Sequence, residues 1–256
     1  MANGVAIFCG NILVEAEMLL EEITMVEFEK GLERTKTIII PFGSIEEHGS
    51  HLPLLTDAIH IYEVAKEASK IIPVYIAPPV YYGICRSTRD HCGTVTVSGE
   101  TLRGLVKDIV QSLYRHGMRS FILLSGHAGG THMAAILEAG EWLKETMPQI
   151  KIAIVSISDL VASIESGIIE TEKDSHAGEV ETSLILYLKP HLVRGKGSEE
   201  YPTFPKPILV RDKRRFWPGG IWGDPTKATK EKGEKLFNHL VSEVVELVKR
   251  IEAWVE

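Results

Sequence analysis

The chain has 256 residues, of which 44% are hydrophobic and 25% are charged, so it can bury a substantial core. A formal net charge of −7 argues against the basic surface of a nucleic-acid-binding protein, and the short basic run at residues 211–215 is typical of a solvated loop. Three cysteines without a CxxC pair favour a reducing compartment, and no apolar stretch reaches the length of a membrane span. We therefore expect a cytoplasmic protein that binds neither nucleic acid nor membrane.

Helical and β-branched segments alternate along the chain. In chain order the pattern predicts a helix at 24–34, a strand at 37–41, a helix at 57–70, a strand at 74–77, a helix at 98–116, a strand at 119–124, a helix at 131–146, a strand at 150–157, and helices at 177–189 and 226–253. Thr24 and Glu27 form a capping-box signature, while Asp57 and Ser98 are the expected caps of the next two helices. Gly117 is the expected C′ residue of the third helix.

This alternation predicts an α/β fold with three layers, α/β/α, around a mostly parallel central sheet. We expect one domain over residues 18–256, preceded by an extension at 1–17 of unknown role. Residues 195–225, rich in proline and glycine, are expected to form an ordered loop region. In such sheets ligands bind beyond the carboxyl ends of the strands, so polar clusters that follow strands are the candidate site.

The first polar cluster follows the first predicted strand and contains Glu46, Glu47, His48, His51 and Asp57. Carboxylates and imidazoles in this arrangement are suitable ligands for Zn²⁺ or Mn²⁺, because neighbouring carboxylates resist burial unless a cation neutralises them. The plainer interpretation is that the glutamates are exposed loop charges, His48 is a turn residue and Asp57 is a helix cap.

Two further clusters strengthen the metal interpretation. His127 lies in the glycine-rich segment SGHAGG, directly after another predicted strand. His176, Glu179 and Glu181 lie at the start of the helix predicted at 177–189. Carboxylates in a first helical turn also suit the helix dipole, so both glutamates have an alternative explanation.

In these motifs the sequence resembles the creatininase family of metal-dependent amidohydrolases. The resemblance runs from about residue 20 to residue 236. It is carried by PFGSIEEHGSHLPLLTD at 41–57, SGHAGG at 125–130, HAGEVETS at 176–183 and GDPTKATKEKG at 223–233. Residues 1–17 precede the usual start of the family pattern.

The resemblance implies two divalent metal ions per chain, Zn, Mn or both. One ion would be held by Glu46, Asp57 and His127, and the other by His48 and Asp57, with Asp57 as the bridge. A glutamate that completes the second position in creatininase itself is replaced here by Gly129. We predict that Glu179 supplies this missing ligand.

The resemblance also implies a mechanism, in which hydroxide generated by the metals attacks a carbonyl and His176 acts as the general acid. In the alternative interpretation, His176 only orients a carboxylate. Glu47, His51 and Glu181 are expected to hold the metal ligands in orientation.

The substrate is expected to be a small cyclic amide or a formamide, hydrolysed at its C–N bond. The segment 83–94 departs from the family pattern, so creatinine itself is disfavoured. Arg86 and Arg89 in this segment would bind a carboxylate or phosphate, although both can also be surface charges. Trp217 and Trp222 are expected to form a pocket wall or to pack the loop around them.

Three alternatives remain at this point. The chain could hydrolyse an inositol-derived cyclic ketone, it could be a formamidopyrimidine deformylase, or it could be a non-catalytic metal-binding oligomeric protein. The irregular spacing of Cys85, His91 and Cys92 disfavours a separate zinc site. By resemblance to the family we expect a homo-oligomer, specifically a hexamer.

Overall fold

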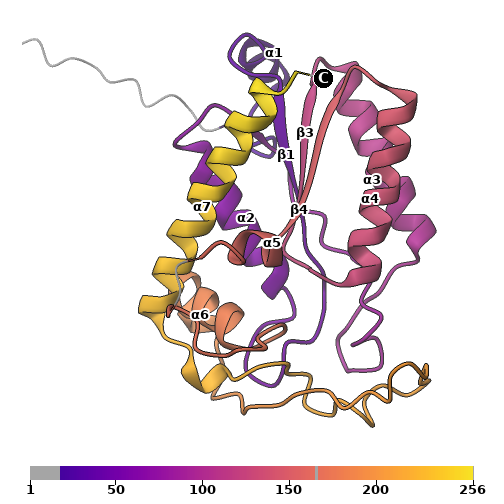
Figure 1. Cartoon of the computed structure of the whole chain (residues 1–256). Helices are drawn as coiled ribbons and strands as arrows, with labels where there is room; N and C mark the ends of the chain where they lie inside the picture. The colour runs from indigo at the N-terminus through magenta and orange to yellow at the C-terminus, as the bar shows by residue number, and fades with distance from the viewer. Residues whose placement is uncertain (1–17, 165–166, 256) are drawn as a thin grey trace, which may run out of the picture.

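A computed structural model describes residues 18–164 and 167–255, and within them four parallel strands form one sheet (Figure 1). The strands are β1 (Thr37–Phe42), β2 (Tyr75–Ile76), β3 (Ser120–Ser125) and β4 (Lys151–Ser156), in the spatial order β2-β1-β3-β4. Phe42 lies opposite Ser125, and Ser125 lies opposite Ser156, so three strands end at the same level. The segments that follow them therefore emerge at one edge of the sheet.

Helices cover both faces of this sheet, which confirms the predicted three layers (Figure 1). Side chains alternate along each strand, so Ile39 and Ile122 face one layer while Ile38 and Phe121 face the other. The first layer contains α2 (Thr56–Ser69), α5 (Ile157–Val161), α6 (Glu179–Leu188) and α7 (Lys230–Ala253). The second contains α3 (Gly99–Arg115) and α4 (Gly130–Thr146), with α1 (Met25–Gly31) beside it.

Local capping signals set several of the helix ends. Thr24 and Glu27 make the predicted capping box, and the Ser98 side chain accepts a hydrogen bond from the Thr101 N–H. Gly117 has a φ of +108° and follows the C-cap of α3, as predicted for a C′ glycine. The prediction for Asp57 was wrong: α2 begins at Thr56 without a side-chain cap, and the Asp57 carboxylate is used elsewhere.

Two elements differ from the predicted pattern for local reasons. The helix expected from residue 177 begins at Glu179, because Ala177 has a φ of +49°, outside the helical range. The five-residue α5 was not predicted, since one turn closed by a capping box of Ser156 and Asp159 has no measurable periodicity. Two short 3₁₀ segments occupy Pro190–Leu192 and Pro225–Lys227.

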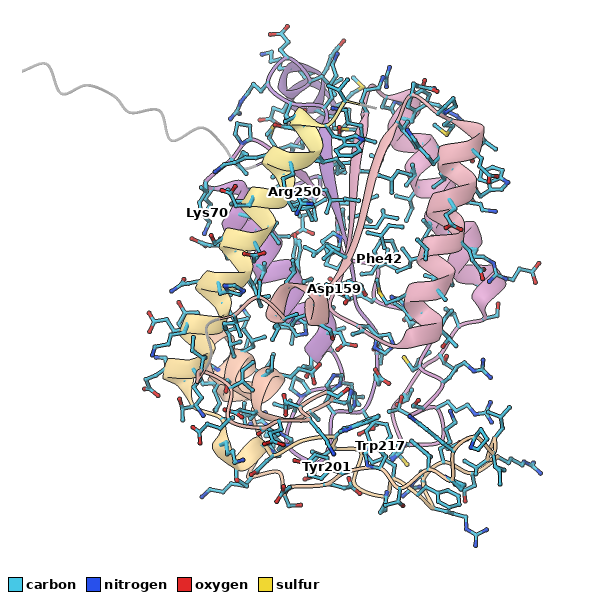
Figure 2. All side chains as sticks on the ribbon, viewed as in Figure 1. Phe42, Lys70, Asp159, Tyr201, Trp217 and Arg250 are labelled. Atoms are coloured by element: carbon cyan, nitrogen blue, oxygen red, sulfur yellow. The ribbon has the colours of Figure 1, made fainter. Side chains whose placement is uncertain are left out.

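The segment 195–225 is ordered, as expected, and runs across the carboxyl ends of the strands at the bottom of Figure 1. Figure 2 shows Trp217 and Tyr201 in this layer, below Phe42. The Glu200 carboxylate accepts hydrogen bonds from the backbone N–H groups of Gly219 and Ile221. The extension predicted at 1–17 lies outside the described residues. Within the described part of the chain, no helix has the length and apolar character of a membrane span.

Candidate metal centre

Four of the predicted metal ligands converge at the carboxyl edge of the sheet. Glu46 and His48 come from the loop after β1, Asp57 from the first turn of α2, and His127 from the loop after β3. His48 Nε2 lies 3.0 Å from Asp57 Oδ1, while His127 Nδ1 lies 3.2 Å from Asp57 Oδ2 and 2.9 Å from Glu46 Oε2. The two oxygens of Asp57 therefore face two different histidines, as a bridging carboxylate would.

In His48 and in His127, one ring nitrogen faces the carboxylates and the other contacts a backbone oxygen. His48 Nδ1 lies 3.0 Å from the backbone oxygen of Glu46, and His127 Nε2 lies 3.2 Å from that of Ile84. An N–H donated to these carbonyls would fix each ring and leave the opposite nitrogen for a metal. This donor set of oxygens and nitrogens fits divalent zinc or manganese.

The structure does not bring Glu179, the predicted replacement ligand, to this group of side chains. Its carboxylate points away from the centre and accepts hydrogen bonds from the backbone N–H groups of Glu170 and Thr171. Lys232 Nζ lies 2.5 Å from Glu179 Oε1, so this buried charge is paired within the fold.

Glu181 occupies the place that was predicted for Glu179. Its Oε2 lies 3.7 Å from His48 Nε2, and its carboxylate groups with His48 and His176 as a set able to hold a metal. Glu181 was expected only to orient a ligand, and the structure brings its carboxylate beside His48 and His176. A side chain at Gly129 would collide with His127, since a Cβ there would lie 2.6 Å from His127 Nε2.

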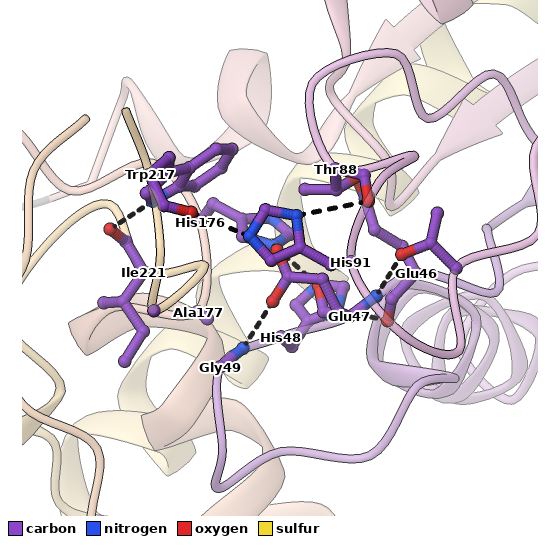
Figure 3. Close-up of polar contacts among 12 residues, drawn as sticks. Glu46, Glu47, His48, Gly49, Thr88, His91, His176, Ala177, Trp217 and Ile221 are labelled. Carbon is purple, nitrogen blue, oxygen red and sulfur yellow. Dashed lines mark hydrogen bonds and ion pairs between the residues drawn. The ribbon is translucent and has the colours of Figure 1, made fainter. Parts of the chain in front are cut away.

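A strained turn at Ala177, before α6, carries His176 next to His48 (Figure 3). Ala177, at a φ of +49°, donates its N–H to Glu181 Oε2 at 2.5 Å. His176 Nε2 lies 2.7 Å from the backbone oxygen of Glu47, and its ring centroid lies 4.3 Å from that of His48. Glu47 therefore holds His176 through its backbone oxygen, and its own carboxylate is fixed because Oε2 accepts a hydrogen bond from the Gly49 N–H. His51 Nε2 lies 2.8 Å from Thr182 Oγ1 on α6.

The buried charges of this cluster stabilise one another. Burial lowers the pKa of His48, but the Asp57 and Glu181 carboxylates outweigh it and raise that pKa well above its ordinary value. His127 behaves in the same way beside Glu46 and Asp57. Burial raises the pKa of Glu46, but His127 reverses the effect and lowers it to about 2. In the absence of bound cations, protons on these two histidines would supply the positive charge that offsets the carboxylates.

A cavity of about 570 Å³ opens above these groups. Its walls include Arg86, Trp217 and Trp222, which were predicted to bind substrate, and Lys213, which the sequence did not indicate. Arg89 is not brought to this cavity, because it is exposed and its Nε lies 3.6 Å from Asp90 Oδ1 at a separate surface hollow. His91 Nε2 lies 2.7 Å from the backbone oxygen of Trp217, and this contact fixes the position of Trp217.

Several residues of the centre were not identified from the sequence. Ser44 Oγ donates to Asp57 Oδ2 at 2.7 Å, and Thr88 Oγ1 donates to Glu46 Oε1. The Cys85 thiol is buried near Glu46 and His127, and burial raises its pKa to about 12. His60 is buried beside Asp57 and Glu181, and neither of its ring nitrogens has a hydrogen-bond partner among the described residues.

The comparisons with known proteins agree on one family. The family model described as creatinine amidohydrolase, or creatininase, matches residues 21–248. The creatinine amidohydrolase of Pseudomonas putida is 28% identical over 247 residues, covering 89% of this chain and 95% of that protein. A mycofactocin precursor peptide peptidase of Mycobacterium tuberculosis is 28% identical over 237 residues, covering 84% of this chain and 85% of that protein. A 3-dehydro-scyllo-inosose hydrolase of Thermotoga maritima is 27% identical over 198 residues, covering 74% of this chain and 61% of that protein.

Solved structures agree with the fold. A crystal structure of creatinine amidohydrolase superposes with a TM-score of 0.83 at 24% identity, covering 93% of this chain and 99% of that one. A structure named "Creatininase Mn" superposes with a TM-score of 0.81 at 25% identity. A variant of creatininase named "Zn-Zn type" superposes with a TM-score of 0.78 at 26% identity. Each of these two covers 91% of this chain and 98% of the other.

Proposed function

Because the chain belongs to the creatininase family of amidohydrolases, we propose that it is a dinuclear metal-dependent hydrolase of a small amide. The observation that carries the proposal is the position of Asp57, whose two oxygens face His48 and His127 at 3.0 and 3.2 Å. A single carboxylate between two imidazoles is suited to bridging two cations.

We assign one ion to Glu46, Asp57 and His127, and the other to His48, Asp57 and Glu181. The manganese and zinc forms of the similar creatininase structures support these two metals as the candidates. Two divalent ions in such a centre supply Lewis acidity and bring the pKa of bound water towards neutrality. The three carboxylates offset the charge of the ions, and Ser44 and Thr88 fix two of those carboxylates in place.

His176 is the proposed general acid, which donates a proton to the nitrogen that leaves when the C–N bond breaks. The contact of its Nε2 with the Glu47 backbone oxygen fixes the ring, so that Nδ1 is the nitrogen left for this transfer. Trp217 and Trp222 line the same cavity, and the ring centroid of Trp217 lies 5.4 Å from that of His176.

The proposed substrate, by resemblance to the family, is a small cyclic amide or a formamide, and a cavity of about 570 Å³ has room for it. Arg86 and Lys213 on its wall would bind a carboxylate or phosphate of that substrate. The inosose hydrolase relative supports a second candidate, an inositol-derived cyclic ketone, and a formamidopyrimidine deformylase is a third. By resemblance to the family, we also propose a homo-oligomer in the cytoplasm, with the hexamer to be tested by light scattering.

The first test is metal content per chain, measured by elemental analysis of protein prepared without chelator or a metal-binding tag. The proposal expects about two ions per chain, and activity on a panel of formamides and cyclic amides. Failure to bind Zn²⁺ or Mn²⁺ would overturn the proposed hydrolase, while bound ions without activity on this panel would support the non-catalytic metal-binding alternative.

The second test separates catalysis from metal binding. In His176→Asn we expect turnover to fall by about 10²-fold or more, as on removal of a general acid, with both ions retained. Loss of metal in this variant would instead show that His176 supports the ligands.

A further inference from the structure

Cys85 is buried inside the metal centre and not in an apolar part of the core. Its Sγ, a carboxylate oxygen of Glu46 and a ring nitrogen of His127 all lie within 4.8 Å of one another. Cys85 as a whole is 1% exposed. A sulfur placed between a carboxylate and an imidazole has the surroundings of a ligand, whereas a packing cysteine is usually surrounded by carbon.

The backbone around Cys85 is tied to the same centre. The N–H of Cys85 donates to Thr96 Oγ1 at 2.9 Å, and the preceding carbonyl, of Ile84, holds His127 Nε2. Thr88, three residues later, donates to the Glu46 carboxylate. This one loop therefore fixes two assigned ligands and directs the thiol between them.

We propose that Cys85 supplies a thiolate to the ion held by Glu46, Asp57 and His127, which makes this position selective for Zn²⁺ over Mn²⁺. The inference rests on the proposed dinuclear centre and adds to it. Thiolate is a soft ligand that zinc binds readily, while manganese prefers oxygen. On binding, the S–H proton is released to solvent and the sulfur pair is donated to the ion, with no change in oxidation state.

The other position, with His48, Asp57 and Glu181, has only oxygen and nitrogen donors among its assigned ligands. The two positions therefore differ in the metal that they favour. When manganese is supplied in excess over zinc, we expect manganese to enter the other position first, while zinc is retained at the Cys85 position.

Cobalt substitution tests the sulfur ligand directly, because a bond from thiolate to Co²⁺ gives a charge-transfer absorption in the near ultraviolet. We expect this band in the unaltered protein and in the control Cys92→Ser, whose cysteine is exposed. It should be absent in Cys85→Ser and Cys85→Ala, while the visible absorption of bound Co²⁺ persists. Two replacements guard against a failure of either one to fold.

Competition between metals gives an independent readout. The excess of Mn²⁺ over Zn²⁺ needed to displace half of the zinc from the Cys85 position should fall by about tenfold or more in Cys85→Ser, since even a group that only supports a metal ligand contributes this much. It should be unchanged in Cys92→Ser. Cobalt bound without the thiolate band, or a band that survives in Cys85→Ser, overturns this inference alone. Absence of cobalt binding overturns it together with the proposed function.

Discussion

Two glutamates at the start of α6 stand two positions apart and have different surroundings. Residues in an α-helix advance by about 100°, so Glu179 and Glu181 point roughly 200° apart. One carboxylate reaches Lys232 and the other approaches His48. The phase of the helix decides which of them can hold a metal.

Glutamine at each position should therefore give opposite results. In Glu181→Gln we expect metal content to fall from about two ions to about one, with loss of activity, because a ligand is removed. In Glu179→Gln we expect metal content to be unchanged and stability to fall by about 2 kcal/mol, since charged hydrogen bonds to Lys232 and the backbone are lost. Elemental analysis and urea unfolding of both variants measure this. Loss of metal in Glu179→Gln alone would reverse the assignment.

The Glu179 pair also predicts a dependence of stability on pH. Burial raises the pKa of Glu179, but Lys232 and the N–H donors outweigh it and lower that pKa below the ordinary value of 4.5. The folded state thus holds the proton less tightly than the unfolded state, and the stabilisation is lost as pH falls below about 4.5. The test is the free energy of unfolding of metal-stripped protein at pH 7 and at pH 4. The difference in this free energy between Glu179→Gln and the unaltered chain should be smaller at pH 4. An equal difference at both values would contradict this origin.

Sequence patterns identified residue types at the site better than they identified orientations. Glu46, His48, Asp57 and His127 follow buried strands that end together, and parallel topology was enough to bring them to one edge. Glu179 was chosen by position, and periodicity could not correct that choice because α6 is buried on nearly all sides. Thr88 and Lys213 reach the cavity, and Cys85 reaches Glu46 and His127, through irregular loops whose path no local pattern encodes.

At the scale of elements, α6 and α7 cross closely at a glycine. A Cβ on Gly233 would lie 2.0 Å from the backbone oxygen of Ser183 on α6. Backbone cannot move aside as a flexible side chain can, so any larger residue would separate the two helices. The helix that would shift also carries Glu181.

We therefore expect Gly233→Ala to destabilise the protein by about 2 kcal/mol or more, as overpacking does, and to weaken metal binding at the Glu181 position. Gly104→Ala is the matched control, since a Cβ there meets nothing within 4 Å on the exposed side of α3. That change should stabilise the protein by about 0.5–1 kcal/mol through helix propensity. Thermal unfolding and metal titration of both variants compare the two glycines. Equal changes in stability and in metal binding would mean that the close approach of α6 and α7 does not limit the size of residue 233.

The elements themselves were largely predictable because their signals are local. The β-branched run at Thr37–Phe42 and the caps at Thr24 and Ser98 each depend on a few adjacent residues. Asp57 satisfies the same capping pattern, yet its carboxylate contacts Ser44 and His48. Tertiary contacts with the metal centre override the local preference at this position.

At the scale of the whole molecule, the residues of the candidate metal centre come from both helical layers, at the carboxyl edge of the sheet. Asp57 and Glu181 belong to helices of one layer, while His127 immediately precedes α4 of the other. Ions bound by all of them would tie these elements together and stabilise the folded state in proportion to their binding. Removal of the metals should consequently affect global stability as well as activity.

That effect should depend on pH in protein stripped of its metals. The pKa values of His48 and His127 are raised in the folded state, so the folded protein keeps protons that the unfolded chain releases above about 6.5. Their stabilising contribution is present below pH 6.5 and is lost as pH rises towards the folded pKa values. Bound ions replace these protons, so the metal-loaded protein should not share the loss. We expect the gap in melting temperature between loaded and stripped protein to be wider at pH 9 than at pH 6, and parallel curves would show that protonated histidines do not substitute for the metals.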